Sequence, residues 1–132
     1  MLSPENPLKL AVVTATRAEY GLLRRLILLG IEDPEIDLRL YVTGTHLSHD
    51  YGYTLAEILK DGIEPFAMIP ILQDGDDALA VSKTCAAALA GFAQAFQDNP
   101  PDAVLYLGDR YEVLPISEAA LHARIPTIHL CG

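Results

Sequence analysis

Short runs of apolar residues alternate along the chain with longer segments in which apolar residues recur at helical spacing. Proline, glycine or polar residues bound the short runs, as is usual for buried strands. The pattern predicts five strands, which cover residues 10–13, 37–43, 66–72, 103–107 and 127–130. The third run contains Pro70, which has no backbone N–H to donate and therefore suits an edge strand.

One helix is predicted after each of the first four strands. The first begins near Glu19 and ends before Pro34, with leucines and isoleucines on one face and arginines on the other. The other three helices cover residues 54–60, 78–97 and 113–123. Thr54 precedes Glu57 by three residues, the spacing of a capping box.

This regular alternation predicts an α/β fold, a parallel Rossmann-like sheet with helices on both faces. Ligands of such sheets bind beyond the carboxyl ends of the strands. The candidate site therefore consists of the segments that follow the strands, which are residues 14–21, 43–52, 108–112 and 129–132.

Composition narrows the range of partners and locations. The chain has 132 residues, enough for one domain, and its net charge of -9 argues against a nucleic-acid or anionic-membrane partner, since both need a basic surface. The two cysteines are far apart and form no disulfide framework. With no basic leader and no apolar run near the length of a membrane span, we expect a cytoplasmic protein.

Two loops carry charged groups suited to chemistry. Arg17 precedes the first predicted helix, where helix dipole and guanidinium together would stabilise an anion, although Thr16 as a simple N-cap with Arg17 in solvent explains the residues equally well. Asp109 and Arg110 follow the most apolar strand. The arginine would hold the aspartate ionised or bind a phosphate itself, whereas the alternative is an ordinary acidic helix start.

Histidines are the remaining candidates. His46 could contact a substrate or be polar surface, and His129 could be a site residue or a hydrogen-bonded core residue. The spacing of His46 and His49 would suit a metal only in a helix, and the acidic run 74–77 lacks the later glutamate of a calcium loop, so no metal is expected. Cys85 is expected in the core.

Four stretches carry a family resemblance: TATRAEYGLL (14–23), TGTHLS (43–48), GDRYE (108–112) and IPTIHLCG (125–132). In order and spacing they resemble the hydrolysing UDP-N-acetylglucosamine 2-epimerases of sialic acid biosynthesis and their relatives that act on bacterial diacetamido sugars. The resemblance runs from the first predicted strand to the last residue.

The resemblance implies an enzyme of the glycosyltransferase-B type, with a nucleotide sugar bound between two Rossmann-like domains. Such enzymes eliminate UDP across C1 and C2 of the sugar and hydrate the product to the free 2-epimer, without a cofactor. Residues 1–132 would then be part of the N-terminal domain, and the C-terminal nucleotide-binding domain would be absent from this chain. Relatives commonly associate, so a homo-oligomer is expected, and the isolated chain is expected to be nearly inactive.

The resemblance also assigns roles to individual residues. Asp109 and His46 would be catalytic, with Asp109 exchanging a proton during elimination or hydration. Substrate or nucleotide would be bound by Arg17, Arg110, Glu112 and His129. Cys131 stands where some members carry a glutamate, so the task of that carboxylate would fall to another group.

Two other functions stay open. A complete five-stranded flavodoxin-like binding or regulatory module would have a C-terminal helix covering its fifth strand. A glycosyltransferase fragment of the same architecture would transfer the sugar to an acceptor instead of releasing it.

Overall fold

The computed structural model describes residues 1–131 and contains one five-stranded sheet. All neighbouring strands are parallel, in the order β3-β2-β1-β4-β5. The strands are β1 (Leu8–Thr14), β2 (Ile36–Thr43), β3 (Ala67–Ile69), β4 (Ala103–Leu107) and β5 (Thr127–Leu130). This is the strand order of Rossmann-type sheets, so the predicted fold class is confirmed.

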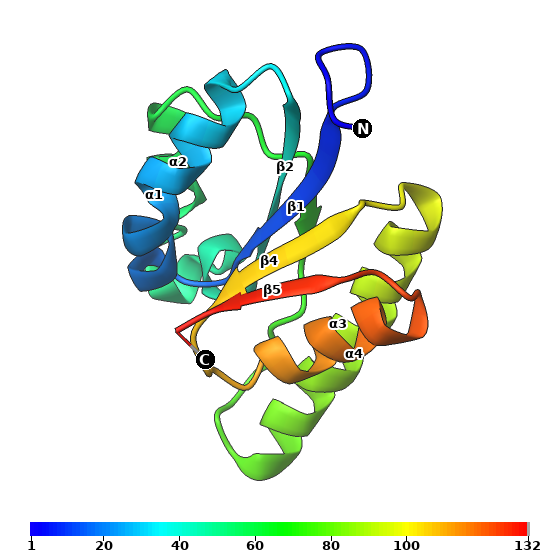
Figure 1. Cartoon of the computed structure of the whole chain (residues 1–132). Helices are drawn as coiled ribbons and strands as arrows, with labels where there is room; N and C mark the ends of the chain where they lie inside the picture. Colours follow the sequence, from blue (N-terminus) through cyan, green and yellow to red (C-terminus); the bar gives the residue numbers. More distant parts are fainter. Residues whose placement is uncertain (132) are drawn as a thin grey trace.

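Helices cover both faces of the sheet, as predicted (Figure 1). They are α1 (Arg17–Glu32), α2 (Leu55–Lys60), α3 (Ala78–Asp98) and α4 (Val113–His122), and two 3-10 helices, η1 (Gly44–Leu47) and η2 (His49–Tyr51), follow β2. Successive side chains of a strand point to opposite faces. Val12 of β1 therefore packs in the core with Leu23 and Ile27 of α1, while Val13 packs in the other core with Phe92 of α3.

The third strand is shorter than predicted. It covers only Ala67–Ile69 and pairs with β2 at the edge of the sheet. Pro70 follows directly and has no N–H to continue the ladder, so the chain leaves the sheet at that residue. The predicted edge position is confirmed, and the predicted extent of residues 66–72 is wrong.

The first helix begins with a capping box. The Thr16 hydroxyl accepts a hydrogen bond from the Glu19 N–H at 3.2 Å, and the Glu19 carboxylate accepts one from the Thr16 N–H at 3.1 Å. The interpretation of Thr16 as an N-cap is therefore confirmed. The capping box predicted at Thr54 is wrong, because Thr54 makes no cap hydrogen bond and Glu57 pairs with Arg17 instead.

Helix α3 is alanine-rich and long. Within the described residues it is the one helix with the length and composition to cross a membrane. Three of its side chains, Ala88, Phe92 and Phe96, are almost fully buried in the core under the sheet. A core helix of a globular domain has the same apolar character, because one face must be buried and small residues allow a close approach.

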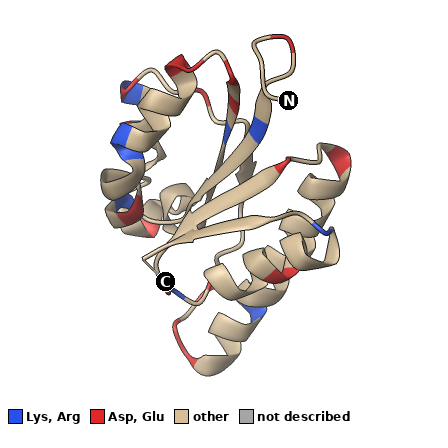
Figure 2. Ribbon diagram, in the orientation of Figure 1, with Lys and Arg blue, Asp and Glu red and all other residues tan. Residues whose placement is uncertain are grey.

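Charged residues lie mainly on helices and loops (Figure 2). Arg17 and Arg110 are in the segments that follow the carboxyl ends of β1 and β4. These two strands are adjacent, and their following helices lie on opposite faces of the sheet (Figure 1). The crevice between such strands is the topological switch point, where open α/β sheets bind their ligands.

Candidate functional site

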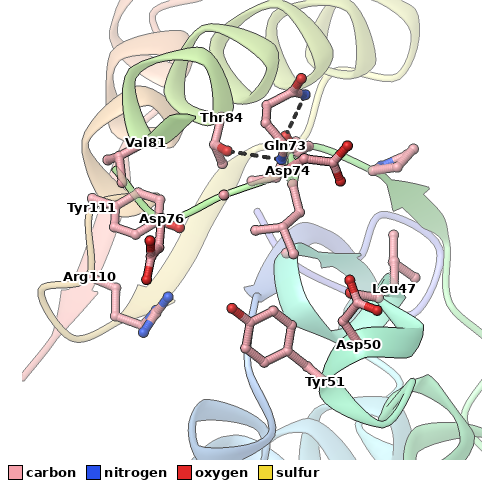
Figure 3. Close-up of a pocket in the computed structure, with 16 residues that line it drawn as sticks. Leu47, Asp50, Tyr51, Gln73, Asp74, Asp76, Val81, Thr84, Arg110 and Tyr111 are labelled. Atoms are coloured by element: carbon pink, nitrogen blue, oxygen red, sulfur yellow. Dashed lines mark hydrogen bonds between the residues drawn. The ribbon is translucent and has the colours of Figure 1, made fainter. Parts of the chain in front are cut away.

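A cleft of about 740 Å³, which we call the main cleft, lies at the carboxyl edge of the sheet. Its wall includes η1 and η2, the loop between β3 and α3, and the loop between β4 and α4. The polar lining residues with long side chains are Asp50, Tyr51, Gln73, Asp74, Asp76, Arg110 and Tyr111 (Figure 3). One cation, several carboxylates and two phenols suit a polar ligand that carries both hydroxyl or amide groups and an anionic group.

A second cleft of about 510 Å³ lies beside the start of α1. Arg17 lines this second cleft, and its Nε donates to Oε2 of Glu57 at 3.0 Å. The Arg17 side chain is 72% exposed, so the ion pair is well solvated and weak. Tyr51 lines both clefts. Arg17 is thus available to an anion at the helix N-terminus, at the cost of releasing Glu57.

The loop after β4 holds an ion pair that differs from the one predicted. Arg110 bonds to Glu112, and its Nε and Nη2 donate to the two carboxylate oxygens at 2.9 to 3.3 Å. Arg110 therefore pairs with Glu112 in place of Asp109, and the other predicted role of Arg110, binding a phosphate, stays a prediction. Asp109 is exposed, whereas Glu112 is buried in front of α4. The reason is geometric, since the chain turns at Gly108 (φ 84°) and then enters α4.

Glu19 lies on the other side of the same crevice, within the candidate segment 14–21, although no individual role was predicted for it. Its carboxylate accepts hydrogen bonds from the N–H groups of Ala15 at 2.9 Å and Thr16 at 3.1 Å. Burial raises the pKa of Glu19 above its usual value, and the negative charge of Glu112 raises it further. The spacing of Thr16 and Glu19 could have identified this residue as a cap, but only the fold brings it within electrostatic range of Glu112.

His46 lies inside the protein and not on the surface of either cleft. Its Nε2 is 2.9 Å from the Thr14 hydroxyl, and its Nδ1 is 2.8 Å from the Thr54 hydroxyl. Burial lowers the pKa of His46 to about 4, so the ring is neutral at physiological pH. The histidine connects β1, η1 and the residue before α2, and its catalytic role stays a prediction.

His129 lies on β5, and its Nε2 donates to the Gly108 carbonyl at 2.5 Å. Its ring packs against Tyr106 with centroids 4.8 Å apart. These contacts connect β5 to the turn that carries Asp109. The predicted role of His129 in binding substrate stays a prediction, and its geometry supports a part in shaping the β4–α4 loop.

The structure divides the predicted site residues into groups. Asp109, Arg110 and Glu112 all belong to the β4–α4 loop, and His129 contacts the start of that loop. Arg17 lies across the switch point at the start of α1. In residues 1–131, the His, Cys, Asp and Glu side chains form no group of three that could hold a metal ion.

Sequence comparison identifies related proteins. The family model described as UDP-N-acetylglucosamine 2-epimerase matches residues 31–132. The chain is 42% identical over 124 residues to the GDP/UDP-N,N'-diacetylbacillosamine 2-epimerase (hydrolyzing) of Campylobacter jejuni. It is 40% identical over 124 residues to the UDP-N,N'-diacetylbacillosamine 2-epimerase (hydrolyzing) of Legionella pneumophila.

These alignments cover 94% of this chain but 32% and 33% of the two relatives, so the chain spans about a third of their length. Among solved structures, a UDP-N-acetylglucosamine 2-epimerase superposes with a TM-score of 0.80 and 27% identity over 94% of this chain and 32% of that protein. The family model, the sequence relatives and the shared fold all indicate the same family. The chain belongs to the UDP-N-acetylglucosamine 2-epimerase family.

Proposed function

We propose that this chain forms one wall of the active site in a hydrolysing nucleotide-sugar 2-epimerase. The substrate would be UDP-N-acetylglucosamine or a diacetamido relative, and the products would be UDP and the free 2-epimer. The observation that carries the proposal is the β4–α4 loop, in which the exposed Asp109 adjoins an arginine that lines the main cleft. The hydrolysing relatives at 40% and 42% identity support it.

The proposed reaction has two steps, an elimination and a hydration, and the proton removed in the first is replaced in the second. In the first, a base removes the proton from C2, the C1–O bond breaks, and its electron pair leaves with UDP. The sugar then holds a double bond between C1 and C2. In the second step, water adds its hydroxyl at C1 and a proton returns to C2 on the opposite face. We propose that Asp109, an exposed carboxylate next to the cleft-lining Arg110, exchanges a proton in this sequence.

The arginines would act on the leaving group. Negative charge grows on the diphosphate as the C1–O bond breaks, and a fixed cation stabilises that charge more in the transition state than in the substrate. Arg110 lines the main cleft and extends toward the opening that Tyr51 faces (Figure 3). Arg17 would contact the UDP moiety after its exposed ion pair with Glu57 opens.

We further propose that residues 1–132 belong to the N-terminal Rossmann-like domain of a two-domain, glycosyltransferase-B-type enzyme, which works in the cytoplasm as a homo-oligomer. The coverage of about a third of each relative supports the domain assignment. The exposed Leu114 and Leu121 on α4 support self-association, because they are large apolar side chains with 73% and 71% exposure.

A chimaera tests the proposed activity. This chain would replace the aligned third of the Campylobacter jejuni relative, to which it is 42% identical, and UDP release from UDP-N,N'-diacetylbacillosamine and UDP-N-acetylglucosamine would be measured. We expect turnover, and a loss of at least about 100-fold for Asp109→Asn, as is usual for a general acid or base. Asp98→Asn, an exposed aspartate at the end of α3, is the control. A folded chimaera without UDP release would refute the function.

A further inference from the structure

Glu112 is the one charged side chain that is buried in the described part of the chain, with 1% of its surface exposed. Burying a carboxylate is unfavourable unless a cation and hydrogen bonds compensate for the lost water. A solvated position in front of α4 would have avoided this cost, since acidic residues there interact favourably with the helix dipole anyway. The burial of Glu112 therefore needs a reason beyond helix capping, and its side chain makes no cap hydrogen bond.

Arg110 supplies the compensation. Its Nε lies 3.3 and 3.1 Å from the two oxygens of Glu112, and its Nη2 lies 2.9 Å from Oε1. A guanidinium has five N–H groups, and this fork uses the Nε–H and one N–H of Nη2. The Arg110 side chain is 44% exposed and lines the main cleft, so the remaining N–H groups are on the accessible part of the side chain.

Glu19 is a third charged group near this ion pair. Glu19 is held by two backbone N–H groups and lies close enough to Arg110 and Glu112 to interact with both charges. Glu19 is in the first turn of α1, and Glu112 precedes α4, so the guanidinium has a carboxylate on each side of the β1/β4 switch point. A side chain with one buried bidentate partner and one nearby carboxylate has few alternative rotamers.

We propose that Glu112 is a positioning residue: it fixes the guanidinium of Arg110 in the main cleft to receive an anionic group of the ligand, such as a diphosphate. Glu112 is then a support for Arg110 and not itself a contact to substrate. The identity of the ligand as a nucleotide sugar rests on the proposed function, whereas the geometry of Arg110 and Glu112 does not.

The direction in which Glu112→Gln changes anion binding distinguishes a positioning role from a purely electrostatic one. Glu112→Gln removes a negative charge beside the cleft, so electrostatics alone predicts tighter anion binding. Positioning predicts weaker binding, because the amide N–H₂ of glutamine cannot accept the second hydrogen bond of the fork. Glu112→Asp keeps the charge and shortens the side chain. Positioning again predicts weaker binding, and electrostatics predicts little change.

The probe is inorganic pyrophosphate, titrated into the 132-residue chain while the Arg110 Nε–H signal is followed by NMR. In the unmodified protein we expect this proton to exchange slowly with water and its signal to shift on binding. Glu112→Gln and Glu112→Asp should speed the exchange and weaken pyrophosphate binding by about fivefold or more, the loss expected for a misplaced charge-assisted contact. Glu118→Gln, which removes an exposed charge from α4, is the matched control.

A double-mutant comparison tests whether Glu112 acts through Arg110. In an Arg110→Ala background, which already binds weakly, Glu112→Gln should have no further effect. Equal losses in both backgrounds, unchanged or tighter binding by Glu112→Gln, or no response of the unmodified protein to pyrophosphate would each overturn the inference. Thermal unfolding of every variant identifies loss of fold. Failure of the epimerase assignment would appear separately, as a folded chimaera that releases no UDP.

Discussion

At the scale of single residues, His46 shows how burial changes the chemistry of a side chain. Its two ring nitrogens face the hydroxyl groups of Thr14 and Thr54. In a neutral ring, one hydroxyl can donate to the unprotonated nitrogen while the other hydroxyl accepts from the ring N–H. Only the neutral ring can use both partners in this way. Loss of hydration on burial disfavours the charged ring, and this effect outweighs the opposing influence of the Thr16 backbone and of the Glu57 charge.

This arrangement predicts a pH dependence of stability. The pKa of His46 falls from 6.5 to about 4 in the folded protein, so below about pH 6.5 the unfolded state binds a proton that the folded state does not. The contribution of the neutral His46 to the stability of the folded protein is fully present above pH 6.5 and is lost as pH falls toward 4. Between about pH 7 and pH 5 the free energy of unfolding should drop by about 2 kcal/mol on this account.

Urea unfolding at these two pH values measures the drop. His46→Gln removes the titrating group and should lose less stability between them than the unmodified protein does. His122→Gln replaces an exposed histidine on α4 and should behave like the unmodified protein. An equal pH dependence in all three proteins would show that His46 does not titrate as its burial requires.

At the scale of elements, the site depends on a close contact between the β1–α1 loop and η1. Gly44 starts η1 with φ 63°, and a Cβ built there would lie 2.7 Å from the Ala15 carbonyl oxygen. The same carbonyl accepts a hydrogen bond from the Thr45 N–H at 2.9 Å. The absence of a side chain at Gly44 therefore lets the two loops meet, which brings the two clefts together around Tyr51.

Gly44→Ala should destabilise the protein by about 3 kcal/mol, because it combines left-handed backbone strain with a steric clash. Gly62→Ala is the matched control, with φ 79° and no atom within 4 Å of the added Cβ. Gly62→Ala should therefore lose only the stability that corresponds to the backbone strain, about 1 kcal/mol. Chemical denaturation of both variants gives the difference, and equal losses would show that the loops separate without cost.

At the scale of the whole molecule, the chain has its own two cores, and we propose that it forms one side of the active site. Elimination of UDP needs groups on both sides of the substrate to orient the diphosphate and exclude water. The hydrolysing 2-epimerases to which the chain is similar are about three times as long as this chain. The arginines and carboxylates described above are thus expected to act together with residues outside this sequence.

We therefore expect the 132-residue chain alone to release UDP from UDP-N-acetylglucosamine at a rate indistinguishable from that in buffer. A coupled UDP assay, with the intact mass confirmed, measures this rate. Turnover on the order of 1 per second, abolished in Asp109→Asn, would show that these residues make a complete site.

Much of the fold follows from the sequence because the signals involved are local. Apolar periodicity and the positions of proline and glycine determine the order and nearly all the extents of the strands and helices. The alternation of strand and helix then leaves a parallel sheet as the consistent arrangement. Strand β3 is shorter than predicted because the ladder hydrogen bonds end at Pro70. The apolar pattern used for the prediction continues past that residue.

The partners of the charged groups required the tertiary structure. Asp109 and Glu112 are both close to Arg110 in sequence, and only the turn at Gly108 and the start of α4 direct the guanidinium to Glu112. Glu19 meets this pair from a distant part of the sequence. The sequence by itself thus determined the family, the sheet and the loops that carry the chemistry. Tertiary packing decided which side chains are buried, paired or free, because desolvation and ion pairing depend on neighbours that the order of residues does not specify.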